Sequence, residues 1–119
     1  MNPKIVNVTP HPLNFLNSDG TEIVVPPSGV VINATATDEA AGSHASGAEL
    51  VRARFTGNAE ASTALDKIEV ENPGAVIVGS LIAAQAYPGR VYGMVAALGF
   101  ERKPPAEKRM NPLKFTTFA

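Results

Sequence analysis

The side chains best suited to a binding site gather between residues 80 and 92. Ser80 follows an apolar run, Tyr87 precedes a Pro-Gly turn, and Arg90 and Tyr92 follow that turn. An arginine can hold a phosphate through paired N–H bonds, and a tyrosine ring can stack on a planar base. The spacing therefore predicts a pocket for a small anionic ligand. A buried helix followed by a solvated basic tail is the structural alternative.

A catalytic interpretation has to start from the two histidines, His11 and His44. His11 lies between two prolines in a turn, whereas His44 lies in a segment rich in Ala, Gly and Ser. Ser80 follows a strand-like run, as a hydrolase nucleophile does, but residues 78–82 read VGSLI and do not match G-x-S-x-G. A helix N-cap is the simpler role for Ser80, and hydrogen bonding to backbone is the simpler role for His11. A ligand contact by His11 stays open, and we expect no enzymatic activity.

Metal and cofactor sites have little support in the sequence. The chain has no cysteine, which excludes disulfides, thiolate metal sites and a cysteine nucleophile. The two histidines and the scattered carboxylates have no ligand spacing typical of a metal site. Neither glycine-rich phosphate motif, G-x-x-x-x-G-K-S/T or G-x-G-x-x-G, occurs. We therefore expect no metal and no cofactor.

The net charge of −1 hides an uneven distribution. Residues 1–89 carry four basic and nine acidic residues, whereas residues 90–119 carry six basic and two acidic ones. Arg109 in this basic tail is predicted to reach into the pocket, with Arg102, Lys103 and Lys108 nearby in sequence. Pairing of the tail with the acidic body is the alternative. The pI of about 6.1 and the lack of a basic-aromatic module argue against a nucleic-acid polymer as partner.

Length and composition indicate one small globular domain. The 119 residues are 45% apolar and 18% charged, and much of the apolar share is alanine. A small, Ala-rich core makes homo-oligomerisation a reasonable expectation, because a partner surface supplies burial that the monomer lacks. No run of about 18 apolar residues and no leader pattern is present, so we expect no membrane partner and a location in the cytoplasm.

The positions of β-branched residues and of turn residues predict a mainly β, α+β fold. Two small antiparallel sheets and one short helix are expected, and the helix covers residues 81–86. Residues 1–96 form the core domain, and residues 97–119 form a C-terminal arm that packs on the core or on a neighbouring subunit. Residues 37–48 and 57–63 are expected to be loops, and residues 65–70 a strand or a short helical turn. The predicted strands cover residues 4–8, 13–16, 21–25, 30–36, 50–55, 75–79 and 91–98, and the arm ends in a strand-like segment at 111–118.

Two segments together resemble a family of small uncharacterised proteins of phages and prophages. Residues 7–14 read NVTPHPLN and lead into an Asp-Gly turn at 19–20 and a PPSG turn at 26–29. Residues 76–90 read VIVGSLIAAQAYPGR, which is similar to the strand-Ser-helix-Pro-Gly-Arg stretch of the same family. The resemblance covers under half of the chain, and residues 97–119 depart from it.

The resemblance implies a phage origin, in the cytoplasm of a bacterial host, but no particular chemistry. By analogy with other small phage proteins, the leading hypothesis is an anti-defence sponge. It would sequester a cyclic nucleotide or a cyclic ADP-ribose-type immune signal without cleaving it. One alternative is a phage structural or accessory protein that binds another protein. The other alternative is a small hydrolase that uses His11 or His44.

Overall fold

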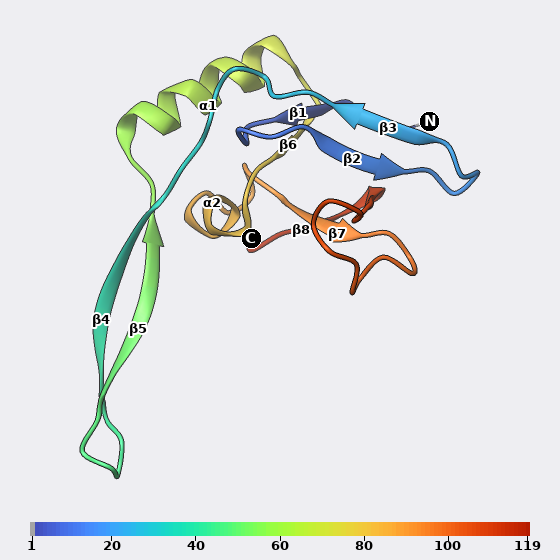
Figure 1. Cartoon of the computed structure of the whole chain (residues 1–119). Helices are drawn as coiled ribbons and strands as arrows, with labels where there is room; N and C mark the ends of the chain where they lie inside the picture. The colour runs from blue at the N-terminus through green and yellow to red at the C-terminus, as the bar shows by residue number, and fades with distance from the viewer. Residues whose placement is uncertain (1) are drawn as a thin grey trace.

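A computed structural model describes residues 2–119, which form eight β-strands and two α-helices (Figure 1). The expectation of a mainly β, α+β fold is therefore confirmed. Three groups of strands make up the fold: a four-stranded sheet, a parallel pair of short strands, and a long two-stranded hairpin. None of the described helices is long and apolar enough to cross a membrane.

The four-stranded sheet has the order β3-β2-β8-β7. β2 (Leu13–Leu16) and β3 (Glu22–Val25) form an antiparallel hairpin around the predicted Asp-Gly turn, where Gly20 has a φ of +89°. β8 (Met110–Thr116) pairs with β2 in parallel and with β7 (Gly93–Ala96) in antiparallel fashion. The C-terminal segment therefore contributes an inner strand to the sheet of the body.

The second group is the parallel pair β1 (Ile5–Asn7) and β6 (Val76–Val78). β6 is the most apolar run of the sequence, and Ile77 and Val78 are buried. Ser80 caps α2 (Leu81–Ala86), and its Oγ accepts a hydrogen bond from the Ala83 N–H at 3.1 Å. The predicted strand, cap and short helix are thus present in the expected order.

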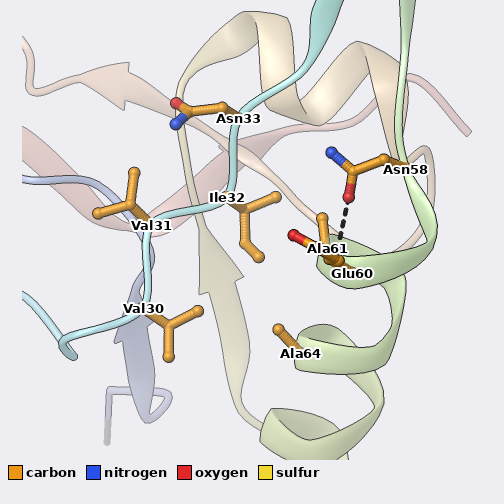
Figure 2. Close-up of a pocket in the computed structure, with 8 residues that line it drawn as sticks. All are labelled: Val30, Val31, Ile32, Asn33, Asn58, Glu60, Ala61 and Ala64. Carbon is orange, nitrogen blue, oxygen red and sulfur yellow. Dashed lines mark hydrogen bonds between the residues drawn. The ribbon is translucent and has the colours of Figure 1, made fainter.

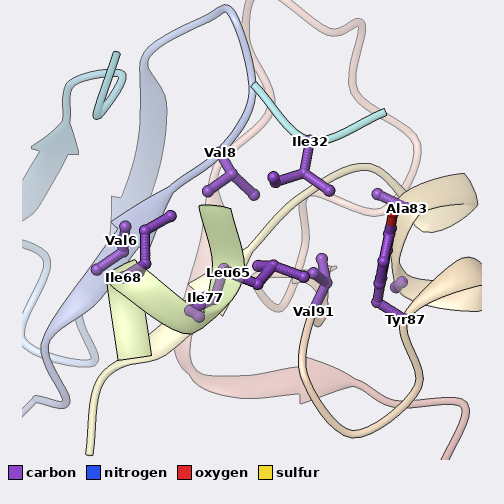
Figure 3. Packing of buried hydrophobic residues seen from close by; sticks show 10 residues of the cluster. Val6, Val8, Ile32, Leu65, Ile68, Ile77, Ala83, Tyr87 and Val91 are labelled. Carbon is purple, nitrogen blue, oxygen red and sulfur yellow. The ribbon is translucent and has the colours of Figure 1, made fainter. Parts of the chain in front are cut away.

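The hydrophobic core lies between these strands and the two helices (Figure 3). Figure 3 shows Leu65 of α1 (Ala59–Glu71) packed among side chains from β6 and the segment after β1. The buried members of this cluster are Val6, Val8, Ile32, Leu65, Ile68, Ile77, Ala83, Ala84, Tyr87 and Val91. A second, smaller cluster consists of Leu13 and Phe15 of β2 and Val78 of β6, so it joins the four-stranded sheet to the parallel pair.

α1 corrects the prediction of a loop at 57–63 followed by a strand or a short turn. The helix runs over 13 residues and is capped by Asn58, whose side chain accepts a hydrogen bond from the Ala61 N–H at 2.8 Å. Leu65 and Ile68 are its buried residues, and alanines occupy much of the rest of its inward face. Alanine carries little hydrophobic signal, so the 3.6-residue period was too weak to read in the sequence.

The predicted loop at 37–48 is also wrong. β4 (Thr35–Ser43) and β5 (Glu49–Thr56) form an antiparallel hairpin that extends away from the body (Figure 1). β4 contains no large apolar residue, so its strand character depends on backbone pairing with β5 and could not be seen in its own sequence. We call residues 35–56 the projecting hairpin. The expected two antiparallel sheets and one helix are accordingly replaced by three strand groups, with parallel pairing in two of them, and two helices.

Candidate functional site

Tyr87, the predicted stacking residue, lies in the hydrophobic core with 7% of its surface exposed. Its hydroxyl oxygen accepts a hydrogen bond from the Asn58 N–H at 2.8 Å, so the phenol secures the N-terminus of α1. A Cβ added to Gly57 would overlap the Tyr87 ring. The ring is therefore enclosed by α1 and the end of β5, and it offers no free face to a ligand.

Arg90 is bound by α1. Its guanidinium donates hydrogen bonds to Glu69 Oε1 at 2.5 Å, to Asp66 Oδ1 at 2.6 Å and to Ser62 Oγ at 3.1 Å. The hydrogen bond to Glu69 raises the pKa of Arg90, against the opposing effect of partial burial, and Asp66 raises it further. With most of its donors already bonded to one helix, Arg90 holds the Pro-Gly turn against α1.

Replacing Arg90 with alanine is expected to lower the free energy of unfolding by about 1–2 kcal/mol, because charge-assisted hydrogen bonds between two elements are lost. Urea unfolding followed by circular dichroism measures this change. Arg54→Ala is the matched control, because Arg54 pairs with Glu39 on an exposed surface and with one carboxylate. Equal stability of the Arg90 variant and the wild-type protein would contradict the role of Arg90 in joining these elements.

Tyr92 and Arg109 lie in two further places. The Tyr92 hydroxyl donates to the Gly89 carbonyl at 3.1 Å, and its ring lines a shallow groove beside Phe115. Arg109 pairs with Glu22 of β3 at 2.7 Å and also donates to the Lys108 carbonyl. The predicted cluster of Tyr87, Arg90, Tyr92 and Arg109 therefore does not line one pocket in this chain.

His11 and Ser80, the other two predicted residues, line one cleft of about 530 Å³. We call it the His11–Lys108 cleft. Its walls come from the turn after β1, the start of α2, β7, and the segment that leads into β8. The lining residues are Thr9, Pro10, His11, Pro12, Leu13, Asn14, Gly79, Ser80, Met94, Pro105, Lys108 and Met110.

Asn7 builds the wall of the cleft that carries His11. This buried side chain donates to the carbonyls of His11 at 2.7 Å and Val25 at 3.2 Å. Its Oδ1 accepts from the Thr9 N–H at 2.9 Å and the Thr9 hydroxyl at 2.7 Å. These four bonds fix the turn between β1 and β2. Asn7 enters the sequence-based predictions only as the start of the NVTPHPLN segment and not as a site residue, although asparagine is a common turn former.

The floor of the cleft depends on close backbone approach at Gly79. A Cβ at this position would lie 2.9 Å from Cγ1 of Val91 and 3.3 Å from Cγ2 of Val8. Because glycine lacks that atom, the chain can pass between the two valines and present Ser80 at the start of α2. Prolines and methionines make most of the remaining surface apolar, and Lys108 supplies a positive charge.

A second cavity lies between the segment after β3 and the first turns of α1 (Figure 2). Figure 2 shows Val30, Ile32 and Asn33 on the segment after β3, and Glu60 and Ala64 on α1. The cavity volume of about 220 Å³ is below the range of about 300–1,000 Å³ that is typical of ligand pockets. It contains no basic side chain, so it suits an anionic ligand less well than the His11–Lys108 cleft.

The shared cleft raises the question whether Ser80 and His11 could act as nucleophile and base. Such a pair needs a contact of about 2.6–3.2 Å, and within residues 2–119 no hydrogen bond joins these two side chains. Ser80 Oγ instead caps α2. Over the same residues, no group of three or more His, Asp or Glu side chains is arranged to hold a metal ion.

No protein-family model, no curated protein and no solved structure matches this chain.

Proposed function

We propose that this protein binds and retains a small anionic ligand with a planar ring, of the nucleotide class, in the His11–Lys108 cleft. The observation that carries the proposal is the composition of the cleft. Flat apolar walls of proline and methionine face a cavity of about 530 Å³ with Lys108 and His11 in its lining. Apolar walls suit a base, and an ammonium group suits a phosphate.

The size and placement of the cleft agree with this ligand class. A volume of about 530 Å³ lies in the range of pockets that enclose most of a small molecule. Lys108 is half-buried, and Arg109 donates to its carbonyl while pairing with Glu22. The backbone that carries the ammonium group is therefore tied to β3, which favours a fixed position for the bound anion.

Retention without cleavage fits the groups in the cleft better than hydrolysis does. Ser80 Oγ is engaged with the Ala83 N–H, and the His11 carbonyl, not its ring, is part of the Asn7 network. The phage origin and the sequestration of a cyclic nucleotide or cyclic ADP-ribose-type immune signal belong to this proposal as its biological setting. Hydrolysis by His11 is the competing function, because the cleft holds a serine beside that histidine.

A thermal-shift screen tests the proposal directly. The probes are cyclic dinucleotides, cyclic trinucleotides and cyclic ADP-ribose isomers, with inorganic phosphate as the reference anion. At a concentration of 100 times Kd, a true ligand is expected to raise the melting temperature by about 10 °C. Heat denaturation should then release the same molecule, identified by mass spectrometry. Release of a cleaved product would support hydrolysis, and the absence of a shift with every probe would overturn the proposal.

Lys108→Ala locates the site for whichever probe binds. Loss of one charge-assisted bond to phosphate is expected to weaken binding by about 10–100-fold. Lys103→Ala is the matched control, because Lys103 is exposed on the same loop and is absent from the cleft lining. It should leave the affinity within about twofold. Equal affinities for wild type and the Lys108 variant, measured by calorimetry, would place the ligand elsewhere.

A further inference from the structure

The projecting hairpin extends away from the body, which it contacts where β5 lies beside α2 (Figure 1). The strands of the hairpin are exposed along almost their whole length, with Ala41 and Phe55 partly covered. The radius of gyration is 16.6 Å, whereas a compact domain of this length has about 13.5 Å. The longest dimension of the molecule is 53 Å and the shortest is 22 Å. The hairpin accounts for this elongated shape (Figure 1).

The strand register gives the projecting hairpin two different faces. Paired residues share a face, so Ala36 with Phe55 and Ala40 with Val51 form an apolar face interrupted by Asp38. The opposite face is mostly polar, with Thr37 opposite Arg54 and Glu39 opposite Arg52, and it holds the ion pair between Arg54 and Glu39. The alternation of side chains along β5 also places Leu50, which is 43% exposed, on this face. Val51 is 54% exposed. An apolar face of this kind needs a cover, because an isolated two-stranded hairpin is at best marginally stable in water.

The edges of the projecting hairpin are protected only in part, by a register shift between Ala40 and Ser43 and by the charged side chains of the two strands. The chain has ten prolines, but residues 35–56 contain neither proline nor lysine, the residues that most often block unwanted strand pairing. Each of the two strands pairs only with the other, so each has an outer row of backbone donors and acceptors. These groups can pair with an incoming strand from another chain.

The body of the same chain exposes an apolar surface that suits the hairpin. Leu81 and Ile82 of α2 are 51% and 44% exposed, although the alanines that follow them are buried. α2 lies beside the end of β5 that joins α1 (Figure 1). A neighbouring hairpin laid across α2 would cover this pair of residues. Because α2 has six residues and is only about 9 Å long, the rest of the apolar face of the hairpin would lie on the surface of the body around α2. The two complementary surfaces on one chain permit a symmetric exchange.

We infer that the projecting hairpin is an assembly element that docks on α2 of a second copy of this chain. Nine residues of strand form a ribbon about 30 Å long and about 10 Å wide, so one face covers about 300 Å². One hairpin on an unrelated surface would bury about 600 Å² in total, below the usual range of specific interfaces. Two reciprocal hairpins bury about 1,200 Å², which reaches that range and favours a second copy as the occupant.

The mass of the protein in solution tests this inference, and it does not depend on any ligand. Sedimentation velocity at about 50 µM should give a dimer or a larger assembly for the wild-type chain. Val51→Glu, which places a charge on the apolar face, should give a folded monomer with an unchanged circular dichroism spectrum. Thr37→Glu is the control, because it places the same charge on the polar face opposite Arg54, and it should assemble like wild type.

A disulfide test identifies the surface that receives the hairpin. Because the chain has no cysteine, a Val51→Cys chain mixed with an Ile82→Cys chain should form a mixed dimer on mild oxidation. A Thr37→Cys chain mixed with the Ile82→Cys chain should form at least tenfold less of the mixed disulfide dimer. A monomeric wild-type protein, or assembly that persists unchanged in Val51→Glu, would overturn the inference. A dimer without the mixed disulfide would remove α2 as the receiving surface.

Discussion

Replacing Tyr87 with alanine is expected to lower the free energy of unfolding by about 3–5 kcal/mol. The ring is buried in the main hydrophobic cluster, and its hydroxyl accepts the Asn58 N–H at the start of α1. The variant therefore loses core packing and also leaves the N–H of the N-cap residue Asn58 without its acceptor. Chemical unfolding followed by circular dichroism gives the value.

Tyr87→Phe separates these two contributions. It keeps the ring and removes the hydroxyl, so it should lose only about 1 kcal/mol. Gly57→Ala tests the packing around the same ring, because the added Cβ would collide with it. This variant should lose about 1–3 kcal/mol of unfolding free energy. A Tyr87→Ala protein that keeps wild-type stability but loses ligand affinity would restore Tyr87 as a stacking residue and contradict this account.

Replacing Asn7 with aspartate is expected to lower the free energy of unfolding by about 3–5 kcal/mol at pH 7. The amide group donates to the carbonyls of His11 and Val25, and a carboxylate cannot donate to either. The substitution also places a negative charge on a side chain that is 1% exposed. The turn that carries His11 should loosen, so ligand affinity should fall together with stability.

The pH dependence distinguishes this charge effect from lost packing. Burial beside two carbonyls is expected to raise the pKa of the introduced carboxyl group above its unfolded value of about 3.9, against the opposing effect of the Thr9 N–H and hydroxyl, which donate to this position. The loss of stability relative to wild type is therefore complete above the raised pKa, and it shrinks as the pH falls through that value. Asn7→Ala, which adds no charge, should lose about 2–3 kcal/mol at every pH. A pH-independent loss in Asn7→Asp would contradict the proposed network.

The parts of the fold that could be predicted from the sequence have strong local signals. The Asp-Gly turn at residue 20 has the positive φ that the dipeptide favours. β6 is a continuous apolar run, and Ser80 caps the helix that follows it. In each case neighbouring residues determine the local conformation, with little help from distant parts of the chain.

α1 and the projecting hairpin have no such local signal. The inward face of α1 relies on alanines beside Leu65 and Ile68, and the residues of β4 are small or polar. Tertiary pairing decides both elements: α1 packs on β1 and β6, and β4 pairs with β5 over seven positions of the register. Reasoning from periodicity fails where the residues on the buried face are small.

The residues predicted for the binding site also divide into those that line the cleft and those that do not. His11 and Ser80 were selected by residue type and do line one cleft. Arg90 and Arg109 were selected for their charge, but their nearest anions are Asp66, Glu69 and Glu22 of the same chain. A sequence gives the chemistry of a side chain but not its partner. Both arginines form ion pairs with carboxylates of their own chain, and for that reason neither belongs to the proposed site.

The most direct test of the ligand proposal follows the backbone amide signals of the ¹⁵N-labelled protein by NMR while the nucleotide selected in the thermal-shift screen is added. We predict that the signals that move belong to the non-proline residues among 9–14, 79–80 and 105–110, around the His11–Lys108 cleft. Signals from residues 87–92 should stay in place. Movement confined to residues 87–92, or no movement at saturating ligand, would contradict the assignment of this cleft as the binding site.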